Sequence, residues 1–165
     1  MGALEFLKGQ HRTFREFFKK LEDERDPREQ GRILQLLIKL LVIHTEIEEK
    51  HLYPRLKVGN DELRELVLES LQEHHVVKVE IDEIEGLVPE VETCRPRIKV
   101  LKDLVFHHVD AEEQVVFPLA EKACGRLALD DIGKELEIET RRLEEKGTRL
   151  LITIMREEVR KESGV

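Results

Sequence analysis

The sequence predicts an all-α protein, an up-down-up-down four-helix bundle with an additional C-terminal helix. Apolar residues recur at helical spacing throughout the chain, and no stretch shows the strict apolar–polar alternation of a half-buried strand. Charged residues make up 39% of the chain and aromatic residues only 4%, a composition typical of helical proteins. At 165 residues the chain is long enough for these helices to share one core.

Each bundle helix is bounded by a recognisable signal. The first helix is predicted over about residues 3–24, and the following helices are separated by proline, by asparagine or by a short loop. These signals are Asp26-Pro27 and Pro54 for the second helix, Asn60 and Pro89 for the third, and the loop through Cys94 and Pro96 before the fourth. One inward stripe per helix contains a histidine: His11, His44, His74 and His108.

A further helical pattern follows Gly125 and runs from about Asp130 to Lys161. We therefore divide the chain into a bundle domain, residues 1–125, and a C-terminal helix, residues 126–165. The run 150–155 is apolar on several faces, so this helix is predicted to pack on the bundle or on a second copy, forming a homodimer.

The charge balance excludes several classes of partner. The 28 lysines and arginines are outnumbered by 36 aspartates and glutamates, giving a net charge of −8 and no basic run suited to nucleic acid or an anionic membrane. Apolar stretches such as residues 36–43 are too short to span a bilayer, and the first residues lack the features of a signal peptide. Cys94 and Cys124 are isolated, so no disulfide framework is predicted. We expect a soluble cytoplasmic protein.

The pattern H-x-x-x-E-E-x-x-x-aromatic-Pro occurs twice, at residues 44–54 and 108–118. A histidine and a glutamate four residues apart share one helix face, a single turn apart. A third histidine stands 33 residues before each copy, His11 before the first and His75 before the second. The aromatic-Pro end of each copy is interpreted as a helix stop. The repeat predicts two matching halves of one metal site.

The first glutamate of each copy, Glu48 or Glu112, lies in phase with the inward stripe, whereas the second, Glu49 or Glu113, is predicted on the surface. A lone histidine on an apolar face is usually a hydrogen-bonded core residue. Chance, however, does not readily bring histidines from four helices to comparable depth. Two buried carboxylates facing each other are costly, and a cation between them removes the cost.

Imidazole and carboxylate ligands suit iron, manganese or zinc. Four histidines and two glutamates are too many for one tetrahedral zinc ion and suit two metals bridged by both carboxylates. The residue types and their number therefore favour a dinuclear site with an open position for a small ligand.

At these residues the chain resembles the hemerythrin-like, HHE cation-binding family, over about residues 4–120. The resemblance rests on Gln10-His11, His44-x-x-x-Glu48-Glu49 with Leu52-Tyr53-Pro54, Glu73-His74, and His108-x-x-x-Glu112-Glu113 with Phe117-Pro118. It implies a hemerythrin-like bundle holding two iron ions, with His11, His44, His74 and His108 as terminal ligands and Glu48 and Glu112 as bridging carboxylates.

The chain departs from that pattern on the third helix. Invertebrate oxygen-carrying hemerythrins take two histidines one turn apart there, whereas His74 and His75 are adjacent and position 78 is lysine. Adjacent residues point about 100° apart, so the two rings cannot easily share the core. The repeat favours His75. The apolar stripe that follows on the same helix favours His74, as does the family's Glu-His pairing, and we take His74 as the ligand. His51 is predicted on the inner face, as a fifth imidazole or a supporting residue, and His107 outward.

The family resemblance implies a centre that binds dioxygen or another small diatomic ligand, for binding, sensing or storage. One alternative is an enzyme acting on nitric oxide or peroxide, or in iron-centre repair. A second alternative is an interaction module that the metal merely stabilises.

Overall fold

The computed structural model describes residues 1–86 and 91–164, the side chains of residues 91 and 92 excepted. The helix end predicted at Pro89 lies outside the described residues. The elements are α1 Ala3–Asp23, α2 Pro27–Ile47, η1 Glu48–Leu52, α3 Tyr53–Leu56, α4 Asp61–Glu85, α5 Val91–Ala111, η2 Glu112–Val116, α6 Phe117–Glu144 and α7 Thr148–Glu162. The two η segments are single turns of π-helix. The described residues thus confirm the all-α prediction.

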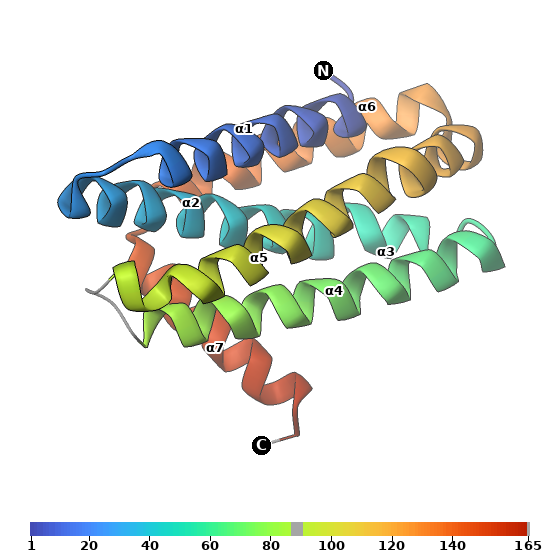
Figure 1. The fold of residues 1–165 in the computed structure, drawn as a ribbon. Coiled ribbons are helices and arrows are strands. Elements are labelled where there is room, and N and C mark those ends of the chain that lie inside the picture. The colour runs from blue at the N-terminus through green and yellow to red at the C-terminus, as the bar shows by residue number, and fades with distance from the viewer. Residues whose placement is uncertain (87–90, 165) are drawn as a thin grey trace.

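Helices α1, α2, α4 and α5 run along one another as the four-helix bundle (Figure 1). Pro27 stands in the first turn of α2, where its missing N–H is not needed. The side chain of Asn60 caps α4 by accepting a hydrogen bond from the backbone N–H of Leu63 at 2.8 Å. The beginnings predicted for these two helices are confirmed.

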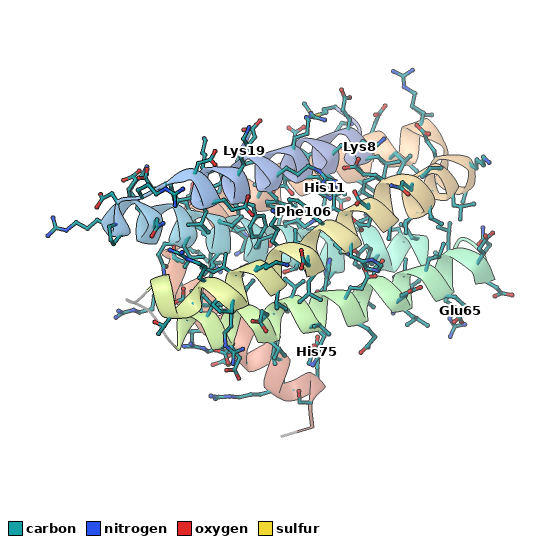
Figure 2. The ribbon with its side chains drawn as sticks, viewed as in Figure 1. Lys8, His11, Lys19, Glu65, His75 and Phe106 are labelled. Atoms are coloured by element: carbon teal, nitrogen blue, oxygen red, sulfur yellow. The ribbon has the colours of Figure 1, made fainter. Side chains whose placement is uncertain are left out.

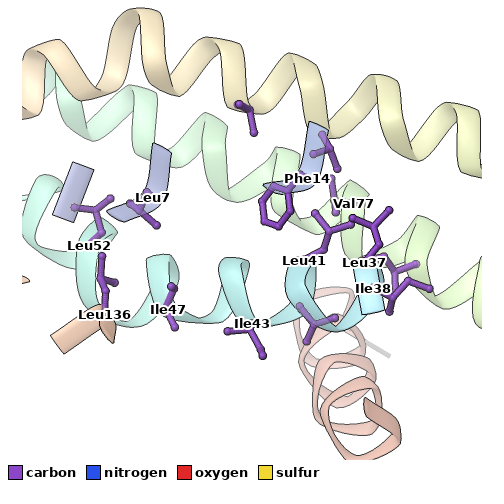
Figure 3. Close-up of a cluster of buried hydrophobic side chains, with 14 of the residues drawn as sticks. Leu7, Phe14, Leu37, Ile38, Leu41, Ile43, Ile47, Leu52, Val77 and Leu136 are labelled. Atoms are coloured by element: carbon purple, nitrogen blue, oxygen red, sulfur yellow. The ribbon is translucent and has the colours of Figure 1, made fainter. Parts of the chain in front are cut away.

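The core lies between these helices and is built from their inward stripes (Figure 3). Leu7, Phe14, Leu37, Leu41 and Val77 are all buried and come from three different helices. Burying each large apolar side chain contributes about 1.5–3 kcal/mol to folding. The apolar layers hold the four helices at fixed positions relative to one another and so determine where the histidines meet.

Neither aromatic-Pro pair stops its helix, so that interpretation was wrong. In each copy the helical turn widens instead: the N–H of Tyr53 bonds to the carbonyl of Glu48, and that of Phe117 to Glu112, each five residues back. This π turn inserts an extra residue into the helix. The following proline falls in the first turn of the next α-helix, where no N–H is required of it.

The C-terminal pattern forms two elements rather than the single helix predicted from 130 to 161. Gly125 has φ 74° and ψ 162°, a left-handed conformation that glycine adopts without penalty, and there the chain doubles back so that the rest of α6 lies along α1 (Figure 1). A second break follows α6, and α7 then crosses α2 and α4. Both segments pack on the bundle of the same chain. The division at residue 125 and the homodimer stay predictions.

None of the helices in the described part of the chain combines the length and the apolar character that crossing a membrane requires.

Candidate metal centre

The six predicted ligands meet inside the bundle. His11 comes from α1, His44 from α2, His74 from α4 and His108 from α5, while Glu48 and Glu112 are the first residues of the two π turns. Figure 2 shows His11 on the inner side of α1. Each of these six side chains is buried.

Two groups of donor atoms can be distinguished within the cluster. One is formed by His11, His44, Glu48 and Glu112, and the other by Glu48, His74 and His108, with the atoms of each group within 4.8 Å of one another. Glu48 belongs to both groups, because its Oε2 lies 3.2 Å from Nε2 of His44 and 3.2 Å from Nε2 of His74.

Glu112 occupies the equivalent place in the second copy of the motif. Its Oε2 lies 3.4 Å from Nε2 of His11 and 3.5 Å from Nε2 of His108. The two carboxylates therefore each stand between two imidazoles from different helices. Such a placement suits a carboxylate that binds a metal ion between helices.

Every one of these imidazoles turns Nε2 inward and has its Nδ1 occupied by an acceptor from another helix. These Nδ1 pairs are His11 with Glu113 at 2.8 Å, His44 with Gln10 at 2.7 Å, His74 with Glu49 at 2.9 Å and His108 with Glu73 at 2.6 Å. Each partner offers an acceptor oxygen, from a carboxylate or from the amide of Gln10, so Nδ1 carries a hydrogen and Nε2 is the atom that faces the centre. Such outer partners fix the tautomer and orientation of metal-binding imidazoles.

The outer acceptors correct one prediction. Glu49 and Glu113 were assigned to the surface, yet their side chains are only 20% and 33% exposed, and each binds a histidine of the cluster. The helical stripe missed them because they lie beside the inward face rather than on it. The second glutamate of each motif copy therefore supports the site.

Tyr53 is a site residue that sequence reasoning missed. Its hydroxyl donates to Oε1 of Glu112 at 2.7 Å and lies 3.2 Å from both Oε2 of Glu48 and Nε2 of His74. The π turn is the cause, because it places the residue five positions after Glu48, rather than four, on the inner face. The signal was the aromatic in the repeat. In the second copy Phe117 stacks on His11 with ring centroids 5.8 Å apart.

The same π turn moves His51 off the inner face, where it had been predicted. Its Nδ1 instead faces Oε2 of Glu135 on α6 at 3.1 Å. His51 belongs to neither donor group of the described residues.

Of the adjacent pair, His74 is the residue that enters the cluster. His75 lies on the outer side of α4, next to α7 (Figure 2), with Nδ1 2.9 Å from Oε2 of Glu162. The side chain of His107 is 74% exposed, as predicted.

The electrostatics of the cluster favour a positive charge at its centre. Burial opposes charge on His108, but the neighbouring carboxylates, Glu112 first, outweigh it and raise the pKa of His108 to about 10. Burial would also raise the pKa of Glu48, yet His44 and the other rings hold it well below its usual value. For His44 burial dominates and keeps its pKa well below the ordinary one.

Several atoms aimed into the cluster have no hydrogen-bond partner among the described residues. They are Nε2 of His11, Nε2 of His44, Oε1 of Glu48 and Oε2 of Glu112. In addition, Nε2 of His74 and Nε2 of His108 lie 3.0 Å apart, and two lone pairs at this distance repel unless a cation or proton stands between them. Unpaired buried donors of these types fit metal ions.

Fold and cluster together define the class of the protein, an all-α bundle built around a candidate metal centre of histidine and glutamate. The chain belongs to the hemerythrin HHE cation binding domain family, whose model matches residues 2–120. This confirms the resemblance noted in the sequence.

Two known proteins are similar to this chain. The crystal structure of a hemerythrin HHE cation-binding domain-containing protein from Mycobacterium kansasii superposes with a TM-score of 0.79 at 19% identity, over 94% of this chain and 99% of that one. A protein named DNA nickase from Nostoc sp. is 27% identical over 119 residues. That match includes 71% of this chain, which spans only 33% of the length of the Nostoc protein.

Proposed function

We propose that this protein is a non-haem di-iron protein that binds dioxygen or a related small ligand at a centre bridged by Glu48 and Glu112. The observation that carries the proposal is the set of four inward Nε2 atoms, each with its Nδ1 held from outside, around two buried carboxylates. Family membership supports a cation there. The choice of iron over manganese or zinc is part of the proposal.

The two donor groups suggest which residues would bind each of the two ions. His11 and His44, with both glutamates, would hold one ion, and His74 and His108, with Glu48, the other. Bound iron would supply the redox-active metal and the open coordination position that a small ligand needs. The protein supplies orientation, because every imidazole is fixed at its outer nitrogen.

The chain's own residues also shape the space around the centre. The Phe14 ring meets the His44 ring edge-on at 4.9 Å, and Phe117 stacks on His11, so apolar rings exclude water from this side. The hydroxyl of Tyr53 lies within hydrogen-bonding distance of both carboxylates. It is placed to hold a proton or to donate a hydrogen bond within the centre.

The test is to load the metal-free protein with ferrous iron without oxygen, count the iron and record the visible spectrum before and after exposure to air. Two ions per chain and a new absorption band that disappears when oxygen is removed would support reversible binding. Less than one ion per chain with no new band would contradict the proposal.

An enzyme acting on peroxide or nitric oxide is the second candidate, and Tyr53 is the observation that favours it. A buried phenol within hydrogen-bonding distance of both carboxylates can hold and return a proton during turnover. Multiple turnovers of peroxide or nitric oxide by the iron-loaded protein would distinguish an enzyme from a carrier.

Three other functions have less support. The DNA nicking in the name of the Nostoc relative is not extended to this chain, because the match spans a third of that protein and this chain carries a net charge of −8. No residue contact described above favours iron-centre repair. A module that the metal only stabilises would unfold on His44→Ala, whereas a binding protein would keep its helices and lose its metal.

A further inference from the structure

The outer partners of the four imidazoles are not equivalent. Among the described residues, Glu49 is the one such partner that also binds a buried lysine. Nζ of Lys78 lies 2.8 Å from Oε1 and 2.9 Å from Oε2 of Glu49, and the lysine is only 2% exposed. Since Oε1 of Glu49 also accepts from Nδ1 of His74, the three side chains form one continuous chain of contacts.

Lys78 is held in this place from the other side by the C-terminal helix. Oε2 of Glu158 on α7 lies 3.6 Å from its Nζ. The helix is anchored over it by the buried side chains of Leu151, Ile152 and Met155 and packs against α2 and α4. An ammonium group is strongly destabilising when buried without partners, so Lys78 depends on both carboxylates.

This arrangement has a consequence for the two halves of the centre. A carboxylate that shares its charge with a lysine attracts the Nδ1 hydrogen less than an unshared one, and outer partners set both the orientation and the basicity of a ligating ring. Glu73, the partner of His108, pairs with no lysine or arginine among the described residues, and its other neighbour is the exposed His107 at 3.4 Å. His74 and His108 therefore differ in their outer environment although they share one donor group.

We propose that Lys78 is a positioning residue for the half of the centre formed by Glu48, His74 and His108: held under α7 by Glu158, it keeps Glu49 on the outer nitrogen of His74. The proposal rests on the proposed function in that the centre binds two metal ions. It also assigns a role to the C-terminal helix, which would act on the metal through Glu158 and Lys78.

The experiment is an equilibrium titration of the metal-free full chain with cobalt(II), followed by visible absorption. Wild type should bind two ions. Lys78→Met should keep one binding step and weaken the other by about 10–100-fold, the effect usual for losing an outer partner. Lys102→Met is the control, because Lys102, whose side chain is 27% exposed, is likewise paired with a glutamate, Glu22, but does not touch the cluster.

Two further variants separate positioning from mere stability. Lys78→Arg keeps the positive charge and should restore most of the second step, whereas Glu158→Gln should weaken the same step by less than Lys78→Met does. Histidine side-chain NMR of the zinc-loaded protein supplies an independent signal. It should show the His74 ring shifted in Lys78→Met and the His11 ring unchanged.

Equal weakening of both steps, an unaltered titration in Lys78→Met, or no rescue by Lys78→Arg would each overturn the positioning role. A wild-type chain that binds no cobalt would instead contradict the proposed function itself. The absence of cobalt binding would be seen in the wild-type titration, before any variant is compared.

Discussion

The hydroxyl of Tyr53 lies 2.7 Å from Oε1 of Glu112, so the aromatic residue of one motif copy touches the carboxylate of the other. The contact crosses the bundle between residues 59 positions apart. It exists because a π turn brings Tyr53 onto the face that carries Glu48. The two halves of the repeat are thus joined by a hydrogen bond as well as by the proposed metal.

Replacing Tyr53 with phenylalanine should leave the fold intact and alter the centre. The ring remains, and the loss of its hydrogen bonds should lower the free energy of unfolding by about 1 kcal/mol. Iron content should stay near that of wild type, while the band formed in air should shift or decay at a different rate. Phe117→Leu, which removes an aromatic ring without a polar group, is the comparison. An unchanged band and decay rate would show that the hydroxyl has no part in ligand binding.

Alanine substitutions at the two adjacent histidines should have opposite outcomes. His74→Ala removes a ring from the cluster. It should raise the Kd for the metal ion held by Glu48, His74 and His108 by tenfold or more, a loss of about 1.4 kcal/mol or more of binding free energy. His75→Ala removes only an exposed pair with Glu162 and should leave the iron content unchanged. The number of iron ions per chain, measured for both variants after dialysis, tests these two outcomes. Equal loss in both variants would contradict the geometry.

Removing the metal should destabilise the protein. Without a cation the two buried carboxylates and the facing lone pairs of His74 and His108 lose their neutralising partner. By linkage, a free metal concentration about 1,000 times the Kd adds about 4 kcal/mol to the free energy of unfolding. Thermal unfolding with and without a chelator measures the difference. In His44→Ala the same chelator should have a much smaller effect.

Acid should weaken the ion pairs of Glu139 on α6, of which the pair with Lys50 joins α6 to η1 and the pair with Arg142 lies within α6. Hydrogen bonds from Arg142, and then from Lys50, hold the pKa of Glu139 at about 2, below its ordinary value of 4.5. A lowered folded-state pKa stabilises the fold above pH 4.5, and this contribution is lost as the pH falls towards 2. Because Arg142 and Lys50 are about half exposed, the stabilisation should be on the order of 1–2 kcal/mol.

Urea unfolding of metal-free Glu139→Gln at neutral and acid pH tests this. The variant should be less stable than wild type near pH 7, and the difference should shrink as the pH approaches 2. The metal-free protein is used so that ligand protonation in the centre does not add to the result. A constant difference over the whole range would exclude the ion pairs as its source.

Helical periodicity in the sequence predicted most residues of the candidate centre. The stripes placed His11, His44, Glu48, His108 and Glu112 on inward faces, and the structure brings all of them together with His74. This succeeded because side-chain direction in a regular α-helix follows directly from the residue number.

Two of the errors share one cause. Both interpretations made downstream of Glu48, with His51 facing inward and the helix ending at Pro54, extended the α-helical period through a π turn. A π turn bonds to the fifth instead of the fourth preceding carbonyl, and the spacing of apolar residues in the sequence does not reveal it.

The sequence alone therefore determined the helical class, the family and the residue types of the centre, since these depend on composition and on spacing within single helices. Only the tertiary structure decided what depends on contacts between helices. They include the hydrogen bond of Tyr53 to Glu112 inside the cluster and the hydrogen bond of each histidine Nδ1 to a side chain from another helix. They also include the packing of α7 over Lys78. Such contacts form only when separate segments dock, and their geometry is set by how all the side chains pack at once.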